Sequence, residues 1–492
     1  IPYFCWHPAL HSIGACRLCA VKAFKGEEDT RGKIVMSCMT PASEGTRISI
    51  SDPDVVKFRR SVIEWLMVNH PHDCPVCDEG GECHLQDMTL LTGQVYRRFR
   101  FKKRSYRNQY LGPLLNHEMN RCIQCYRCVR FYCDYAGGRD LNVFGWHDHV
   151  YFGRHEDGIL QNEFAGNLAE ICPTGVFTDK TFKQHYTRKW DLQTAPSVCV
   201  HCSLGCNTIP GERYGMLRRI RNRYNSEVNG YFLCDRGRYG YEFVNHPERL
   251  KRAFVRRQGR NFEPVPREDI LKELKPFIYE SGRMIGIGSS RASVETNYAL
   301  LSLAGPENFY ASAPRAELDA VSLIVDILHR GNVPSASLHD VAHADAVLIL
   351  GENLPDTAPI AALAVRQSAL QKPLSISRKM KISDWHDMAV REAIQDDYGP
   401  LYIATPNATR LDDIATDTYR AAPDDIARLG FAVAREIASE APAVADLSDQ
   451  ARTLAQKIAE SLKDAERPVV ISGASQMKPA IIQAAANVAR AL

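Results

Sequence analysis

The chain has 492 residues, of which 45% are hydrophobic and 24% charged, and its formal net charge is +3. This composition is typical of a globular protein with several domains, and so small a net charge gives no reason to expect nucleic-acid binding. No run of 18 apolar residues occurs, so we expect membrane association only through partner proteins. The sequence begins with Ile1 rather than Met and ends inside an apparent helix, which predicts truncation at both ends.

The 16 cysteines all lie at or before Cys234, and the second half of the chain has none. Many are separated by only two or three residues, which is too close for a conventional disulfide framework and favours metal binding in a reducing compartment. Fifteen of them, together with His70, fall into four groups with the spacing of iron–sulfur ligands. Structural zinc is the alternative for these groups, because zinc binds the same side chains.

The first group has gaps of ten, two and eighteen residues and consists of Cys5, Cys16, Cys19 and Cys38. Plant-type ferredoxins bind a 2Fe–2S cluster with a similar core and a distant fourth cysteine, so this group predicts 2Fe–2S. Gly14 suits a loop that turns its backbone amides toward sulfur. The β-hairpin that usually opens this fold is missing before the first cysteine.

Apolar residues at helical spacing predict a helix over residues 54–68, with Asp52 or Asp54 as its cap. This helix leads to the second group, which follows H-x3-C-x2-C-x5-C and consists of His70, Cys74, Cys77 and Cys83. The group predicts a 4Fe–4S cluster with one histidine ligand, and a neutral imidazole in place of a thiolate should raise its reduction potential. His72 competes with His70 within the same loop.

Residues 97–107 alternate basic and aromatic side chains, RRFRFKKRSYR. Such a pattern occurs in nucleic-acid binding. Period-two alternation also fits a strand with one solvated face. We therefore predict a basic edge strand or a docking surface for an acidic partner.

The third group combines a closely spaced triplet with a remote cysteine that precedes a proline, and its members are Cys122, Cys125, Cys128 and Cys172. Bacterial ferredoxins complete a 4Fe–4S cluster in this way. Cys133 lies one place too late for the ferredoxin run and lacks the proline, so we interpret it as a small apolar residue that binds no metal.

The fourth group follows C-x2-C-x3-C-x27-C and consists of Cys199, Cys202, Cys206 and Cys234. Its spacing again favours 4Fe–4S over zinc. The segment between the last two cysteines predicts a module rich in β-hairpins.

From about residue 249 the pattern changes, and residues 249–268 are typical of a linker. Strands are predicted at 284–288, 346–350, 401–404 and 468–471, separated by helices such as 361–370. This alternation favours an α/β domain with a parallel sheet. The Gly-rich turn after residue 288 could hold a phosphate at a helix N-terminus, although the motif is weak.

Several segments resemble one family along the whole chain: NHPHDCPVC, HEMNRC, GNLAEICPTGVFTDKT, PGERYG, YFLCDRGR and IGIGSSRASVE. They are similar to the family of G subunits of bacterial NADH:quinone oxidoreductase, respiratory complex I. The resemblance implies α+β iron–sulfur modules at 1–50, 51–93, 94–191 and 192–248, then an α/β molybdopterin-oxidoreductase-like domain at 249–492. It also implies one 2Fe–2S cluster, three 4Fe–4S clusters and no molybdopterin.

The same resemblance implies an electron-transfer component of a proton-pumping enzyme, without catalytic residues of its own. Electrons from NADH would arrive from the flavoprotein (FMN) subunit and pass toward quinone, with NADH and quinone bound on other subunits. The cluster of the fourth group is usually off that route. The expected partners are the flavoprotein and the other peripheral-arm subunits, on the cytoplasmic side of the bacterial inner membrane.

Two alternatives share parts of this pattern. The catalytic component of a molybdenum or tungsten formate dehydrogenase-like enzyme would have the fourth group and the α/β domain. Such enzymes often have a lysine soon after the last cluster cysteine and a later Cys or selenocysteine on the metal, whereas this chain has Asp235, Arg236 and no later cysteine. A serine ligand keeps this alternative open. The other alternative is a zinc scaffold without redox activity.

Overall fold

The computed structural model describes residues 1–256, 259, 261–280, 282, 284–384, 386–395 and 397–492. These residues form two compact units, which are described separately below. The first comprises Ile1–Gly240, Asn332–Gln476 and Ala480–Leu492, and the second comprises Tyr241–Gly331 with Met477–Pro479. Among the described residues, no helix has both the length and the apolar character that crossing a bilayer requires.

The first unit begins with a three-stranded antiparallel sheet in the order β2-β1-β3, whose strands are β1 (Ala20–Phe24), β2 (Lys33–Met36) and β3 (Arg47–Ser49). The predicted helix follows as α1 (Pro53–Met67), and Asp52 caps it by accepting a hydrogen bond from the amide of Asp54. Arg59 of α1 donates to the carbonyl oxygen of Ala20 at 2.9 Å. Helix and sheet are therefore joined directly beside the first cysteine group.

The segment after α2 (His84–Thr92) corrects one prediction. Residues 97–107, all of them described, form no strand. Their polar groups instead bind side chains and carbonyls of the segments before and after them. The amide and guanidinium of Arg98 donate to Glu64, and Lys103 donates to the carbonyl oxygen of His70. Alternation in the sequence suggests a strand, but side chains such as Glu64 and Asn69 accept hydrogen bonds from the backbone amides that a strand would use for pairing.

The third cysteine group lies in a region of short elements, which are β4 (Leu115–His117), α3 (Arg127–Val129), β5 (Asn142–Phe144), β6 (Tyr151–Gly153), α4 (Leu168–Ile171), β7 (Phe177–Asp179) and α5 (Lys180–Lys183). Strand β4 pairs antiparallel with β7, and β5 with β6. A π-helix over Arg130–Tyr135 continues from α3. Large aromatic side chains such as Phe131, Tyr132 and Phe152 are fully buried between these elements.

The fourth group is built around a predicted hairpin that the structure confirms. The elements are β8 (Gln193–Thr194), β9 (Ser197–Val198), β10 (Asn207–Arg213), β11 (Met216–Asn222) and α6 (Asp235–Tyr239). Strands β10 and β11 pair antiparallel through a two-residue turn at Tyr214 and Gly215, where φ is 56° and 74°. Positive φ at both positions is the conformation of a tight hairpin turn.

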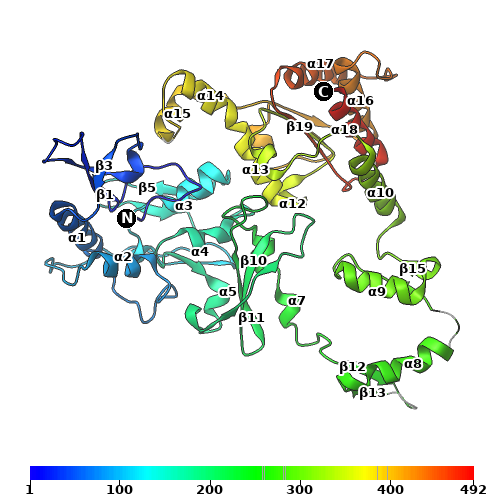
Figure 1. Ribbon diagram of the computed structural model, residues 1–492, viewed down its shortest axis with the longest axis horizontal. Coiled ribbons are helices and arrows are strands. Elements are labelled where there is room, and N and C mark those ends of the chain that lie inside the picture. The colour runs from blue at the N-terminus through cyan, green and yellow to red at the C-terminus, as the bar shows by residue number, and fades with distance from the viewer. Residues whose placement is uncertain (257–258, 260, 281, 283, 385, 396) are drawn as a thin grey trace. The chain divides into compact units, whose positions relative to one another are not determined.

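The rest of the first unit is an α/β domain with a parallel sheet in the order β18-β17-β16-β19. Its strands are β16 (Ala346–Leu350), β17 (Leu401–Thr405), β18 (Asp417–Arg420) and β19 (Pro468–Ser472). Alternate residues of β16 pack against helices on opposite faces: α16 (Pro423–Ile437), α17 (Asp449–Asp464) and α18 (Pro479–Ala491) on one face and α13 (Pro359–Ala369) on the other (Figure 1). The fold class and these predicted elements are confirmed.

The second unit contains α7 (Glu242–Asn245), β12 (Ala253–Arg256), β13 (Phe262–Val265), α8 (Ile270–Glu280), β14 (Gly286–Ile287), α9 (Val294–Ala304), β15 (Phe309–Tyr310) and α10 (Arg315–Arg330). The expected linker at 249–268 contains the β12–β13 pair, while its residues 257, 258 and 260 lie outside the described part. The strand predicted at 284–288 is only two residues long. The Gly-rich loop that follows this strand leads into α9.

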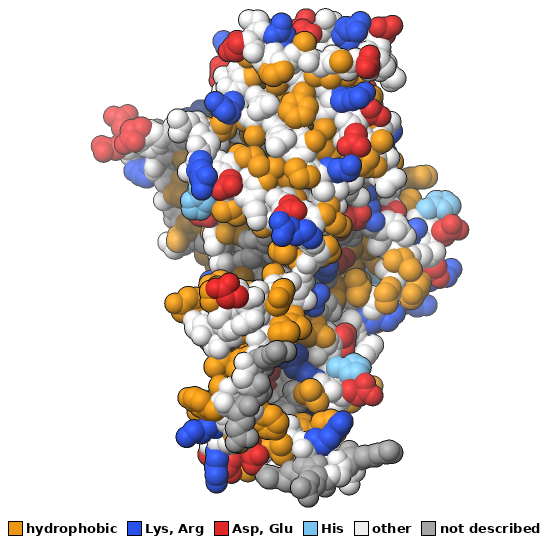
Figure 2. Space-filling view, turned by 90° about the vertical axis from the view of Figure 1, so that its right-hand side faces the viewer, with side chains coloured by type: hydrophobic (Ala, Val, Ile, Leu, Met, Phe, Trp, Pro, Cys, Tyr) orange, Lys and Arg blue, Asp and Glu red, His pale blue; other side chains and the backbone are white. Residues whose placement is uncertain are grey.

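Figure 2 shows one face of the molecule, on which apolar side chains are interspersed with charged ones.

Candidate metal centres

The first cysteine group forms one compact site. The sulfur atoms of Cys19 and Cys38 lie 3.3 Å apart, and the amide of Cys5 donates to the sulfur of Cys16 at 3.4 Å. Hydrogen bonds from the thiols of Cys16 and Cys38 lower the pKa of Cys5. Cys5 therefore connects the Cys5–Cys16 pair with the Cys19–Cys38 pair. Gly14 has a φ of 63°, as expected for the loop before Cys16. All four predicted ligands therefore meet.

The second group surrounds a cavity of about 350 Å³. Its lining includes all four predicted ligands, His70, Cys74, Cys77 and Cys83. His70 is 9% exposed, and within the described structure its Nδ1 atom is buried without a hydrogen-bond partner. Burial lowers the pKa of His70 to about 4, so the imidazole is neutral at pH 7, which is the form that binds metal. A buried imidazole nitrogen without a protein partner, beside three thiols, has the surroundings of a metal ligand.

His72 lines the same cavity, with its ring centroid 6.0 Å from that of His70. It is exposed and has a positive φ of 57°. His70 is thus the better-positioned of the two candidates, because its nitrogen is buried.

Guanidinium groups from distant segments hold the cysteine loop of this cavity. Arg121 pairs with Asp73 at 2.7 Å, and Arg188 donates to the carbonyl oxygen of Cys77 at 2.7 Å. Gly175 closes the cavity wall, and a Cβ atom there would lie 2.5 Å from the Cys77 sulfur. The backbone therefore approaches the Cys77 sulfur more closely than any residue with a side chain would allow.

The triplet of the third group lies in α3 and the loop before it, with Cys125 and Cys128 buried. Gln124 and Tyr126 have φ values of 54° and 62°, and the amide of Gln124 donates to the Cys122 sulfur at 3.3 Å. Burial, followed by the nearby Cys172, raises the pKa of the Cys125 thiol to about 11. Cys172 and Cys125 each act electrostatically on the other members, Cys122 and Cys128. The remote cysteine therefore joins the triplet as predicted.

Cys133 differs from these cysteines in its partner. Its thiol donates a hydrogen bond to the carbonyl oxygen of Leu141 at 2.9 Å, from within the π-helix. Burial raises its pKa to about 12, so the thiol stays protonated. This geometry agrees with the interpretation of Cys133 as a residue that binds no metal.

The fourth group gathers at the start of α6. The sulfur of Cys234 caps this helix by accepting a hydrogen bond from the amide of Gly237 at 3.4 Å, and a Cβ atom on Gly237 would lie 3.3 Å from the Cys199 sulfur. The amide of Cys199 donates to the carbonyl oxygen of Cys206 at 2.8 Å. Burial is the main cause that raises the pKa of Cys206 to about 12, and Cys234, Cys199 and Cys202 contribute to the same rise.

In the ranges that the structure describes, no three His, Cys, Asp or Glu side chains are close enough to bind a single metal ion. A 4Fe–4S cluster distributes its ligands over four iron atoms, so its thiols need not converge on one point. The assignment of the four sites to clusters rests on the ligand spacing and on the cavity around His70.

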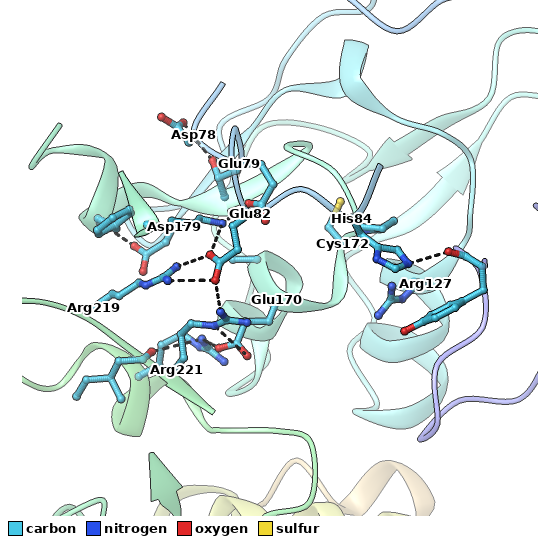
Figure 3. A pocket seen from close by; sticks show the side chains of 18 residues that line it. Asp78, Glu79, Glu82, His84, Arg127, Glu170, Cys172, Asp179, Arg219 and Arg221 are labelled. Atoms are coloured by element: carbon cyan, nitrogen blue, oxygen red, sulfur yellow. Dashed lines mark hydrogen bonds and ion pairs between the residues drawn. The ribbon is translucent and has the colours of Figure 1, made fainter. Parts of the chain in front are cut away.

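A charged cavity of about 220 Å³ separates the His70 loop from Cys172 and β11, and sequence reasoning did not find it. Figure 3 shows Cys172, His84 and Arg127 on one side and Glu82, Arg219 and Arg221 on the other. Its ion pairs are Glu79–Lys189 (2.5 Å), Glu82–Arg219 (3.1 Å), Glu82–Arg221 (2.5 Å) and Glu170–Arg238. The partners of all four pairs lie 68 to 139 residues apart in the chain, so no local motif signals them.

A buried carboxylate, that of Glu352, lies at the carboxyl ends of β16 and β19. The strand order reverses between these two strands, which is where α/β sheets bind ligands. Glu352, 6% exposed, accepts hydrogen bonds there from the amide and hydroxyl of Ser475 and from the hydroxyl of Thr357. A Cβ atom on Gly473 would lie 2.6 Å from this carboxylate. The carboxylate of Glu352 therefore occupies the place where an anionic ligand would bind in such a sheet.

Four family profiles match the chain in the order of these sites. They are described as the NADH-ubiquinone oxidoreductase-G iron-sulfur binding region (residues 59–96), the ferredoxin-like domain of NADH-quinone oxidoreductase subunit 3 (112–178), the molybdopterin oxidoreductase Fe4S4 domain (192–246) and molybdopterin oxidoreductase (249–386). The first two cover the second and third cysteine groups, and the third covers the fourth group.

Curated relatives match over the whole chain. The G subunit of NADH-quinone oxidoreductase from Pseudomonas putida is 56% identical over 496 residues, and the proteins of the same name from Escherichia coli and Salmonella typhimurium are 54% identical over 492 residues. The chain belongs to the family of NADH-quinone oxidoreductase G subunits. Each alignment covers 100% of this chain and 54% of the relative, so the chain spans about half the length of the G subunits it matches. The formate dehydrogenase-like alternative is not favoured by these relatives.

Proposed function

We propose that this chain is the electron-transfer part of the G subunit in a proton-pumping NADH:quinone oxidoreductase. Its cofactors are one 2Fe–2S cluster, bound by the Cys5 group, and three 4Fe–4S clusters, bound by the groups of His70, Cys122 and Cys199. Each cluster would carry one electron at a time. The chain's own residues position them, exclude water from them and adjust their potentials.

The cavity around His70 is the observation that carries this proposal. It brings one neutral imidazole and three thiols, predicted from spacing alone, around one space of about 350 Å³. The buried Nδ1 atom of His70 has no hydrogen-bond partner among the described residues, and a side chain on Gly175 would intrude on the Cys77 sulfur. These features fit a resident group larger than a side chain.

The partners proposed for this chain are the flavoprotein subunit, which delivers electrons, and the other peripheral-arm subunits, which receive them. The chain then lies on the cytoplasmic side of the bacterial inner membrane and reaches the membrane through those partners. NADH and quinone bind elsewhere in the complex. This assignment follows from the family of its relatives and from the four cysteine sites.

The α/β domain holds no molybdopterin in this proposal. Molybdopterin cofactors carry phosphate, and phosphate requires hydrogen-bond donors at the crevice where the strand order reverses. Here Glu352 uses the amide and hydroxyl of Ser475, and its negative charge repels a phosphate. The residues at this place do not fit such a cofactor.

The proposal is tested on the full-length protein in its complex, purified without oxygen. We expect iron and sulfide close to the content of one 2Fe–2S and three 4Fe–4S clusters, no stoichiometric zinc or molybdenum, and EPR signals that appear on reduction with NADH. Protein that contains zinc in place of iron and gives no signal with dithionite would exclude electron transfer. Stoichiometric molybdenum would exclude the statement about the α/β domain alone.

A further inference from the structure

Two buried guanidinium groups lie between the Cys5 group and the Cys122 group. Arg127 and Arg130 are 8% and 6% exposed and come from α3 and the π-helix that continues it, on either side of Cys128. Arg130 donates to the carbonyl oxygens of Cys5 and His11. It therefore links the backbone of the first site to the helix that carries the third site.

The hydrogen bonds of both groups go to uncharged acceptors. Arg130 also donates to the Tyr126 carbonyl oxygen at 3.4 Å, and Arg127 donates to the Phe4 carbonyl oxygen at 3.4 Å. The Nε atom of Arg127 is buried without a partner in the described structure. Backbone carbonyls satisfy N–H donors without neutralising the positive charge, which therefore acts on whatever anion lies nearby.

The cysteines that act most strongly on these charges belong to two different predicted sites. Burial lowers the pKa of Arg130, and the groups that oppose this most are Cys5 and then Cys125, ahead of Asp134. Conversely, Arg127 and Arg130 both act to lower the pKa of Cys125. Two other buried guanidiniums act on a single predicted site each, Arg59 on Cys19 and Arg121 on Cys77. Arg130 is thus shared between two sites.

We propose that Arg130, with Arg127 beside it, raises the reduction potentials of the clusters bound by the Cys5 and Cys122 groups. This role rests on the proposed function, because it requires both clusters. Reduction adds one electron to a cluster, and a fixed positive charge in a poorly solvated interior stabilises the more negative state. Arg130 is a positioning and tuning residue, since its hydrogen bonds go to backbone carbonyls of the ligand loops.

The test is an EPR redox titration of the full-length protein in its complex, with the variant Arg130→Gln. We expect the Cys5 and Cys122 clusters to shift to lower potential, each by about tenfold in the one-electron equilibrium, which corresponds to about 59 mV. The His70 cluster should keep its potential. Arg130→Lys retains the charge and should keep both clusters nearer the wild-type values.

Two further variants separate charge from folding. Arg127→Gln removes a charge held by a single long hydrogen bond, so it should assemble even if Arg130→Gln does not, and it should lower the potential of the Cys122 cluster. Arg59→Gln is the matched control, and it should shift the 2Fe–2S cluster alone. Unshifted potentials in Arg127→Gln, and in Arg130→Gln where it assembles, would refute the tuning role. A wild-type complex without reducible clusters in these groups would refute the proposed function instead.

Discussion

Gly175→Ala tests the His70 cavity by adding one methyl group to its wall. The new Cβ atom would lie 2.5 Å from the Cys77 sulfur and 3.2 Å from the Cδ atom of Arg121. Carbon and its neighbours in a packed interior prefer about 3.5–4.0 Å, so the sulfur or the backbone must move by roughly 1 Å. The φ of Gly175 is not in the left-handed region, so alanine can adopt the backbone and the effect is steric.

Overpacking of this kind costs about 1–3 kcal/mol, which corresponds to roughly 5- to 150-fold in an equilibrium constant. Because the strain falls on a ligand sulfur, we expect it to reduce binding of the group in that cavity. The Cys5 and Cys199 groups should be unaffected, whereas the Cys122 group should respond in part, because Gly175 lies three residues after its ligand Cys172. Gly399→Ala is the control: its Cβ would meet no atom closer than 3.4 Å, which is an ordinary contact.

The measurement is iron and sulfide per protein together with the EPR signal of each cluster, before and after a short warming step. Gly175→Ala should lose the His70 cluster first and keep the Cys5 and Cys199 clusters, and Gly399→Ala should match the wild type. A Gly175→Ala protein with the full signal and the same loss rate as the wild type would refute the placement of the cluster beside Cys77.

Three other substitutions address single residues. His70→Cys should still assemble a cluster but at lower potential, because a thiolate replaces a neutral imidazole; an unchanged EPR midpoint would rule out His70 as the ligand. Cys133→Ala should keep the wild-type iron and sulfide content, and a loss of one cluster would show that Cys133 binds metal. Glu170→Gln leaves Arg238, 3% exposed, without its carboxylate, and should destabilise the protein by about 3–5 kcal/mol in thermal or denaturant unfolding. Asp319→Asn, in an exposed helical pair with Arg315, should cause little change, and equal losses in both variants would contradict the burial argument.

The sequence predicted the ligands better than it predicted what surrounds them. Cysteine spacing has few physical explanations, and the structure brings each of the four groups together, including Cys172, which is forty-four residues from Cys128. The helix at Pro53–Met67 and the strands of the parallel sheet also followed from periodicity. The strand expected at 97–107 was wrong because alternation describes side chains only. Backbone pairing depends on a neighbouring strand, and Glu64 and Asn69 occupy those amides instead.

The buried charges could not be predicted, because each depends on a partner far along the chain. Arg130 reaches Cys5 across 125 residues, Arg188 reaches Cys77 across 111, and Arg219 reaches Glu82 across 137. An arginine in a sequence of 61 basic residues gives no sign that it will be buried. Burial of a guanidinium is unfavourable unless every donor is satisfied, so each of these contacts forms only when both segments are in place. The loops that present the cysteines are therefore stabilised by one another, and we infer that the sites assemble as a group rather than one at a time.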